Sequence, residues 1–200
     1  MNLLSGRLPY EINGVPIDPS YRVMVKFETI LADPNKSNIE KVLPTLESFY
    51  RQPVPDLQKA WDGLLWFYLG GADATEAGTG GVAKRIYDFE QDSPHIYTAF
   101  LQVYGIDLQM TDLHWWAFRQ LFFDLPDTCL MGKIMGFRGA DTSRMKGAEK
   151  KYYQSMQKLF ALKTKGPAEH LSTADKETIY LYKVRKRYEE AQKWAQKERK

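Results

Sequence analysis

The N-terminal part of the chain shows two different patterns of apolar and polar positions, one typical of a β-hairpin and one typical of a helix. In "YEINGVPID" (10–18), Asn13-Gly14 separates two short β-capable runs, and this pair accepts the positive φ angles of a tight hairpin turn. Beyond Asp18-Pro19, apolar side chains recur every three or four residues. We therefore predict a small hairpin and then an amphipathic helix, with Asp18 as N-cap, Pro19 in the first turn, and one apolar face made of Val23, Met24, Phe27, Ile30 and Leu31.

Helical spacing continues through most of the chain. A helix is predicted over 37–50, where Pro44 removes one backbone bond and should bend it. The next helix, "LQKAWDGLLWFYLGG", should end at Gly70-Gly71, and the small residues of 70–81 predict a mobile loop. Further helices are predicted after Ser93-Pro94, from Thr111 or Asp112 to Asp124, within 127–139, and within 143–162, the last with an apolar stripe of Met145, Tyr152, Met156, Leu159 and Phe160.

The C-terminal part differs in composition from the rest. "KTKGPAEH" reads as a linker, and 172–199 keeps a 3-4 apolar stripe between charges, which predicts a basic amphipathic helix. The predicted fold class is mostly α: a compact multi-helix domain over residues 1–165 with a small N-terminal β-hairpin, followed by a linker and a basic helix over 166–200.

Composition narrows the class of protein. With 200 residues, 44% of them hydrophobic and 26% charged, the chain is typical of an ordinary globular protein. Cys129 is the only cysteine, which excludes an intramolecular disulfide and a thiolate zinc cluster. We find neither an apolar run of about 18 residues nor a signal-peptide pattern at the start, so a cytosolic protein without a membrane span is expected.

Charge is distributed unevenly. Residues 1–143 hold 12 Lys/Arg against 18 Asp/Glu, whereas residues 144–200 hold 16 against 7. Such a basic tail can bind nucleic acid by releasing counterions from phosphates. Glu189 and Glu190 interrupt the positive run, and no nucleic-acid-binding motif accompanies it, so a protein-docking or solvated helix is favoured and nucleic acid remains the alternative.

Candidate chemistry is sparse. None of the three histidines stands in a paired metal spacing, and His114 falls among apolar positions, which predicts a structural role. The carboxylates Asp88, Glu90 and Asp92 could hold a divalent cation, but they lack the EF-hand spacing, so a solvated turn or helix cap is favoured. "GTGGVAKR" fails the Walker pattern, and no nucleophile motif appears. We expect no enzymatic activity, no cofactor and no metal.

The segment "DLHWWAFRQLFFDLPD" (112–127) is unusually rich in aromatic residues. As a helix it has a broad apolar arc that we predict to be core, comprising Trp115, Ala117, Phe118, Leu121, Phe122 and Leu125. A narrower second strip should contact another chain, because one domain of this size rarely encloses a helix on all sides. The predicted partner-binding residues are Leu113, Trp116 and Phe123 in this strip, and Lys183, Arg185, Lys186 and Arg187 in the tail.

Several motifs of the chain also occur in a fixed order that is similar to a known family. They are "YDFEQD" (87–92), "IYTAF" (96–100), "YGIDL" (104–108), "LHWWAF" (113–118), "LPDT" (125–128) and "IMGFR" (134–138). Over roughly residues 3–165 the chain resembles the bacteriophage "gene product fifteen" family. One position departs from its pattern: Asp127 follows Pro126 directly, where the family pattern has one more residue.

The resemblance implies a protein of long-tailed phages and prophages that is encoded near the tape-measure gene. Such proteins act as tail assembly chaperones, which keep the tape-measure protein soluble and recruit tail-tube subunits. The implied partners are therefore the tape-measure protein and the tail-tube protein, with self-association as a further possibility, and no catalytic residues are implied. The implied location is the host cytoplasm, during infection or from a prophage, or the virion. A minor structural part of the tail is the alternative role.

Overall fold

The computed structural model describes residues 4–34, 36, 38–72 and 84–163. These residues form two compact units: the first contains the described residues of 4–19 and 30–72, and the second contains 20–29 and 84–163. The predicted linker and basic helix of 166–200, with Lys183, Arg185, Lys186 and Arg187, lie outside the described residues, as does most of the predicted loop 70–81. The domain boundary predicted at 165–166 therefore stays a prediction.

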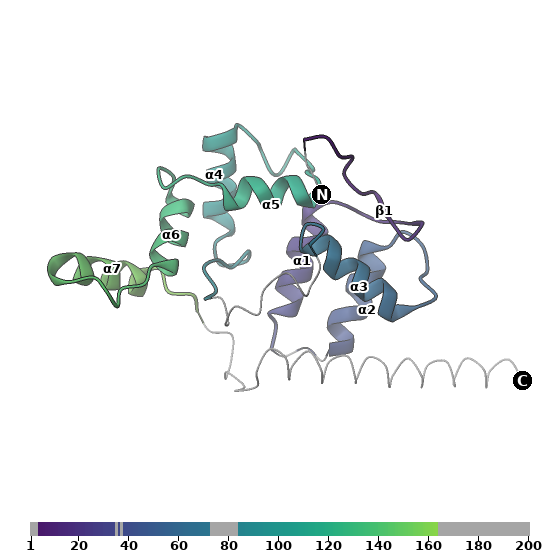
Figure 1. Ribbon diagram of the computed structural model, residues 1–200, viewed down its shortest axis with the longest axis horizontal. Coiled ribbons are helices and arrows are strands. Elements are labelled where there is room, and N and C mark those ends of the chain that lie inside the picture. The colour runs from purple at the N-terminus through teal and green to yellow at the C-terminus, as the bar shows by residue number, and fades with distance from the viewer. Residues whose placement is uncertain (1–3, 35, 37, 73–83, 164–200) are drawn as a thin grey trace, which may run out of the picture. The chain divides into compact units, whose positions relative to one another are not determined.

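The predicted fold class, mostly α with a small hairpin, is confirmed (Figure 1). None of the helices in the described ranges is long and apolar enough to cross a membrane. In chain order, the elements are β1 (Glu11–Ile12), β2 (Val15–Pro16), α1 (Tyr21–Leu31), α2 (Asn38–Phe49), α3 (Leu57–Tyr68), α4 (Ser93–Tyr104), α5 (Trp115–Phe123), α6 (Leu130–Gly139) and α7 (Gly147–Leu159).

The hairpin of the first unit turns at the predicted place. Asn13 and Gly14 have φ angles of 51° and 76°, as a type I′ turn requires, and β1 pairs with β2 in antiparallel register. The buried side chain of Ile12 approaches α3 so closely that a Cβ at Gly63 would lie 2.8 Å from its Cγ2 atom. Glycine at position 63 thus lets the hairpin pack on the helix.

Helices α2 and α3 pack against each other in the first unit. The rings of Phe49 and Phe67 meet at 5.1 Å between centroids, and both side chains are buried. Pro44 lies inside α2 as predicted. Helix α3 starts at an N-cap, Asp56, and ends before Gly70 and Gly71, whose positive φ angles stop it as predicted.

Tyr50, directly after α2, provides a test of this packing. Its buried hydroxyl donates to the Ala60 carbonyl at 2.9 Å, and burial raises the pKa of this phenol to about 12. The folded state therefore favours the neutral phenol, and this contribution is present below pH 10 and lost as the pH rises from about 10 to about 12. At about 1.4 kcal/mol per pKa unit, the loss is about 2–3 kcal/mol.

We expect the free energy of unfolding, measured by urea titration, to fall more steeply between pH 10 and 12 in the native chain than in Tyr50→Phe. The substitution removes the titrating group and keeps the ring. An equal fall in both proteins would show that Tyr50 ionises without cost to the fold.

Helix α1 begins later than predicted. Asp18 and Pro19 lie before the helix, and the Asp18 N–H donates to the Phe49 carbonyl at 2.7 Å. Ser20 takes the capping position instead, since its Oγ accepts from the Arg22 N–H at 3.2 Å. The prediction of Asp18 as N-cap was wrong, because hydrogen bonds with Phe49 and Arg51 hold Asp18 in the segment before the helix.

The core of the second unit is built around α5. Phe118 stacks between Tyr21 of α1, at 4.6 Å, and Phe100 of α4, at 4.9 Å. Trp115 and Phe122 are buried beside it, so most of the broad arc of the aromatic segment is core as predicted, although Ala117 and Leu121 are only half-buried. Helix α6 lies beside α4, and α7 follows it (Figure 1).

Candidate functional site

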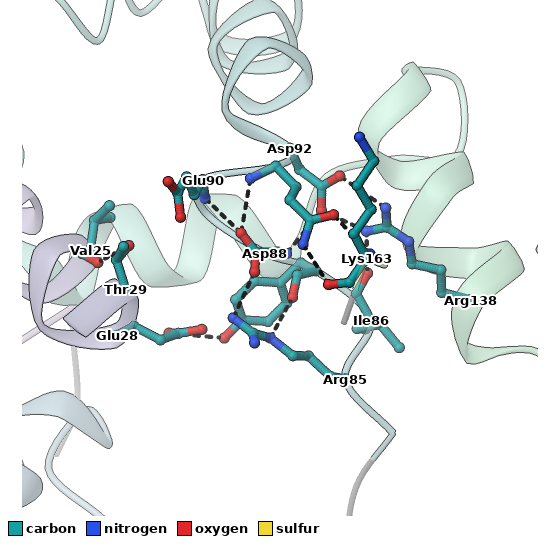
Figure 2. Close-up of polar contacts among 12 residues, drawn as sticks. Val25, Glu28, Thr29, Arg85, Ile86, Asp88, Glu90, Asp92, Arg138 and Lys163 are labelled. Carbon is teal, nitrogen blue, oxygen red and sulfur yellow. Dashed lines mark hydrogen bonds and ion pairs between the residues drawn. The ribbon is translucent and has the colours of Figure 1, made fainter. Parts of the chain in front are cut away.

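The second unit contains a group of paired charges, the acid–arginine cluster, made of the buried Asp88, Asp92 and Arg138 and the exposed Arg85 (Figure 2). Asp88 and Asp92 come from the segment that leads into α4, and Arg138 comes from the last turn of α6. Asp88 and Asp92 are 3% exposed and Arg138 is 7% exposed. Charges removed from water to this degree need partners with good geometry.

Arg138 binds groups of two other segments, the one that leads into α4 and the one that follows α7. Its Nη1 and Nη2 atoms donate to the two carboxylate oxygens of Asp92 at 2.5 and 2.9 Å, a bidentate pair. Nη1 also donates to the Ile86 carbonyl at 3.1 Å, and Nε donates to the Phe160 carbonyl at 2.6 Å. Four of the five guanidinium N–H donors are thereby used.

Asp88 organises the turn before α4. Its Oδ1 atom accepts from the N–H groups of Glu90 and Gln91 at 2.9 and 2.8 Å, and its Oδ2 atom pairs with Arg85 at 3.1 Å. The Asp88 N–H in turn donates to Asp92 Oδ2 at 2.9 Å. Each carboxylate therefore binds both a backbone N–H and an arginine.

The chain after α7 is tied to the same turn. The Gln91 side-chain amide donates to the Lys163 carbonyl at 3.1 Å and accepts from the Lys163 N–H at 2.9 Å. The Arg138 bond to Phe160 is a further contact of this kind. The cluster and these bonds therefore connect the start of α4, the end of α6 and the residues that follow α7.

The solvated turn predicted for Asp88 and Asp92 was wrong, because both carboxylates are buried and paired with arginine, while Glu90 is exposed. Asp92 does stand at the N-cap position of α4, but its side chain makes no capping bond. Among the described residues, no group of three His, Cys, Asp or Glu side chains is placed to hold a metal ion. Sequence reasoning missed Arg138, although a single arginine after the apolar run of α6 is a signal for a buried ion pair.

His114 caps the aromatic helix. Helix α5 begins at Trp115, and His114 precedes it with Nδ1 accepting from the Trp116 N–H at 3.1 Å. The start predicted at Thr111 or Asp112 was wrong, because the Asp112 carboxylate accepts from Ser20 Oγ at 2.6 Å and the segment before His114 is not helical. The imidazole thus has a structural contact in the fold, at the end of the helix rather than within its apolar arc.

The three residues of the predicted partner-binding strip on α5 differ in their exposure to solvent. Trp116 is 2% exposed, Leu113 is half-buried, and Phe123 is 44% exposed. Placing Trp116 on an exposed strip was wrong, since its indole is part of the protein interior and cannot contact another chain. Partner binding by Leu113 and Phe123 remains a prediction.

Phe123 is held in position although nearly half of its ring is exposed. The Tyr87 ring lies edge-on at 5.8 Å between centroids, and the Arg119 guanidinium lies over the Phe123 ring at 5.3 Å. An exposed aromatic side chain that neighbours fix in place loses little conformational entropy when a partner covers it.

Exposed side chains continue past Phe123 into α6. The α5–α6 corner is the exposed set Phe123, Asp124, Asp127 and Leu130. Gly132 shapes this corner, because a Cβ there would lie 2.1 Å from the Pro126 carbonyl oxygen. That oxygen also accepts from Cys129 Sγ at 3.2 Å, so the backbone of the corner is fixed close to α6.

Helix α7 is attached by a narrow edge and has no buried residue. The Gln157 amide donates to the carbonyls of Phe137 and Ala140 at 2.9 and 2.8 Å, and the rings of Phe137 and Tyr153 meet at 5.7 Å. The apolar stripe predicted for this segment was partly wrong: Met145, Met156 and Phe160 are half-buried, whereas Tyr152 and Leu159 are exposed by 53% and 67%.

Comparison with known proteins yields one family. The family model described as "Bacteriophage Gp15 protein" matches residues 4–162, which include both the acid–arginine cluster and the α5–α6 corner. No curated protein and no solved structure matches the chain significantly.

Proposed function

The chain belongs to the bacteriophage Gp15 family and is therefore a phage protein, and from this premise we propose that it is a non-enzymatic tail assembly chaperone. Its partners would be the tape-measure protein and the tail-tube subunits of a long-tailed phage or prophage. It would act in the host cytoplasm during assembly. A minor structural part of the tail is the second candidate role, which family membership supports equally and which would place the chain in the virion.

The state of the charged groups supports a binding role over a chemical one. The carboxylates of Asp88 and Asp92 accept hydrogen bonds from N–H groups of this chain and pair with its arginines. A general acid or base needs an oxygen within reach of the atom with which it exchanges a proton. Carboxylates that are buried and bonded in this way serve to hold the fold.

The observation that carries the proposal is the exposure of Phe123 on an otherwise buried aromatic helix. The other aromatic side chains of α5 are buried in the core: Trp115, Trp116, Phe118 and Phe122. Aromatic side chains that partners desolvate contribute strongly to protein interfaces. An apolar segment of the tape-measure protein is the partner that such a side chain suits.

Phe123→Ser should weaken capture of the tape-measure protein. We expect a loss on the order of tenfold or more in pull-down after co-expression with the neighbouring tape-measure gene, because a central aromatic contact is removed. Leu101→Ser is the matched control, since Leu101 on α4 is also 44% exposed and should not matter. Circular dichroism should show the same helicity in all three proteins. Equal capture by the native chain and both variants would contradict the proposal.

A further inference from the structure

The exposed ring of Phe123 has a cation beside it whose hydrogen-bond donors are unused. Arg119 is half-buried, and its guanidinium lies over the Phe123 ring at 5.3 Å. A contact with the face of a ring takes up none of the five N–H donors of a guanidinium. Within the part of the chain that the structure describes, the Arg119 side chain forms no hydrogen bond and no ion pair. In the acid–arginine cluster, by contrast, Arg85 and Arg138 each bind at least two oxygens.

The state of Arg119 indicates which kind of group can bind next to Phe123. Half-burial removes part of the water around the guanidinium, and the aromatic ring replaces this water with a cation–π contact but not with acceptors. A carboxylate supplies two acceptor oxygens at the spacing of the N–H groups of an arginine. The neighbouring ring favours an apolar side chain beside this carboxylate.

The other charges of the α5–α6 corner determine on which side of Phe123 a carboxylate can lie. Each residue of an α-helix turns by roughly 100°, so Arg119 stands roughly 40° to one side of Phe123 and Asp124 stands roughly 100° to the other. Asp124 and Asp127 are exposed, and so is Lys133 in α6. The corner is therefore of mixed charge, and its two carboxylates repel an acidic group on the side away from Arg119.

We propose that Arg119 and Phe123 together recognise a helical segment of the partner that carries a carboxylate and a large apolar side chain one turn apart. The carboxylate would accept hydrogen bonds from Arg119, and the apolar side chain would cover the exposed part of the Phe123 ring. Because the two residues are themselves four positions apart in α5, side chains at the same spacing on another helix can reach both. This inference rests on the proposed function, since it names the chemistry of the tape-measure segment that Phe123 would bind.

Two synthetic helix-forming peptides test this recognition on the purified full chain. Both have one central phenylalanine among alanine, leucine and glutamine residues. The acidic peptide has a glutamate four residues before the phenylalanine, and the neutral peptide has a glutamine there. In fluorescence anisotropy of the labelled peptides, the native chain should bind the acidic peptide about threefold to tenfold more tightly, between the effects of an exposed ion pair and of a buried charge-assisted bond.

Variants of the chain assign this preference to single residues. Arg119→Gln should bind the two peptides equally, and Phe123→Ser should weaken the binding of both. Lys133→Gln removes the same charge from an exposed position and should keep the preference of the native chain. Arg119→Glu should instead prefer a third peptide, in which lysine replaces the glutamate. Circular dichroism should first show that all four variants fold.

Equal binding of the acidic and neutral peptides by the native chain overturns the proposal, as does binding of neither. It is also overturned if Lys133→Gln loses the preference as Arg119→Gln does, because general positive charge would then attract the glutamate. The co-expression pull-down tests the chaperone function separately. Capture of the tape-measure protein without a preference for the acidic peptide would support that function and overturn this inference. A preference that depends on Arg119, without such capture, would support the site and overturn the proposed partner.

Discussion

Arg138→Met is expected to lower the free energy of unfolding by about 3–5 kcal/mol, the cost of leaving one charge of a buried pair without its partner. The substitution keeps an unbranched apolar stem but removes both bonds to Asp92 and the bonds to the carbonyls of Ile86 and Phe160. Lys133→Met on the same helix removes an exposed cation and should change stability by less than about 0.5 kcal/mol.

A double-mutant cycle separates the ion pair from the other bonds of Arg138. Asp92→Asn removes the opposing charge and keeps an oxygen that can accept from the Asp88 N–H. Because Arg138→Met/Asp92→Asn leaves no unpaired charge, the double variant should lose less than the sum of the single losses, by at least about 1 kcal/mol. Urea unfolding followed by circular dichroism measures all three. Additive losses would show that the pair contributes nothing beyond its separate contacts.

The features that sequence patterns predicted correctly are local. Asn13 and Gly14 fix the hairpin because the turn needs two positive φ angles in adjacent residues, and few other pairs accept them. Gly70 ends α3 for the same reason. The apolar periodicity of Phe118 and Phe122 identified the core face of α5, since burial of that face is the dominant stabilising contribution.

The features that the patterns did not predict depend on residues far apart in the chain. Asp92 and Arg138 are separated by 46 positions, and no periodicity connects them, so the acidic motif before α4 was interpreted as a solvated turn or helix cap. Trp116 and Phe123 share one strip of the α5 helical wheel, yet the first is buried and the second is exposed. A helical wheel shows which side chains share a face of the helix. It does not show which of them are covered by neighbouring elements of the fold.

Gly132 carries a constraint that the apolar pattern does not show, although the residue it contacts, Pro126, is close in the chain. In Gly132→Ala the new Cβ would lie 2.1 Å from the Pro126 carbonyl oxygen, and this is backbone rather than the end of a flexible side chain. Cys129 holds the same oxygen through its N–H and its Sγ, both at 3.2 Å, so the carbonyl cannot withdraw without breaking these bonds. We expect a loss of about 3 kcal/mol or more in the free energy of unfolding, at the upper end of overpacking costs.

Gly136→Ala is the matched control, because Gly136 lies one turn further along α6 and a Cβ there would meet nothing within 4 Å. Alanine is favoured over glycine inside a helix by about 0.5–1 kcal/mol, so this variant should be more stable than the native chain. The same substitution in one helix should thus change urea stability in opposite directions at the two positions. Stabilisation by both would mean that the α5–α6 corner can move away from α6, and the surface that carries Phe123, Asp124 and Asp127 would then be no rigid docking site.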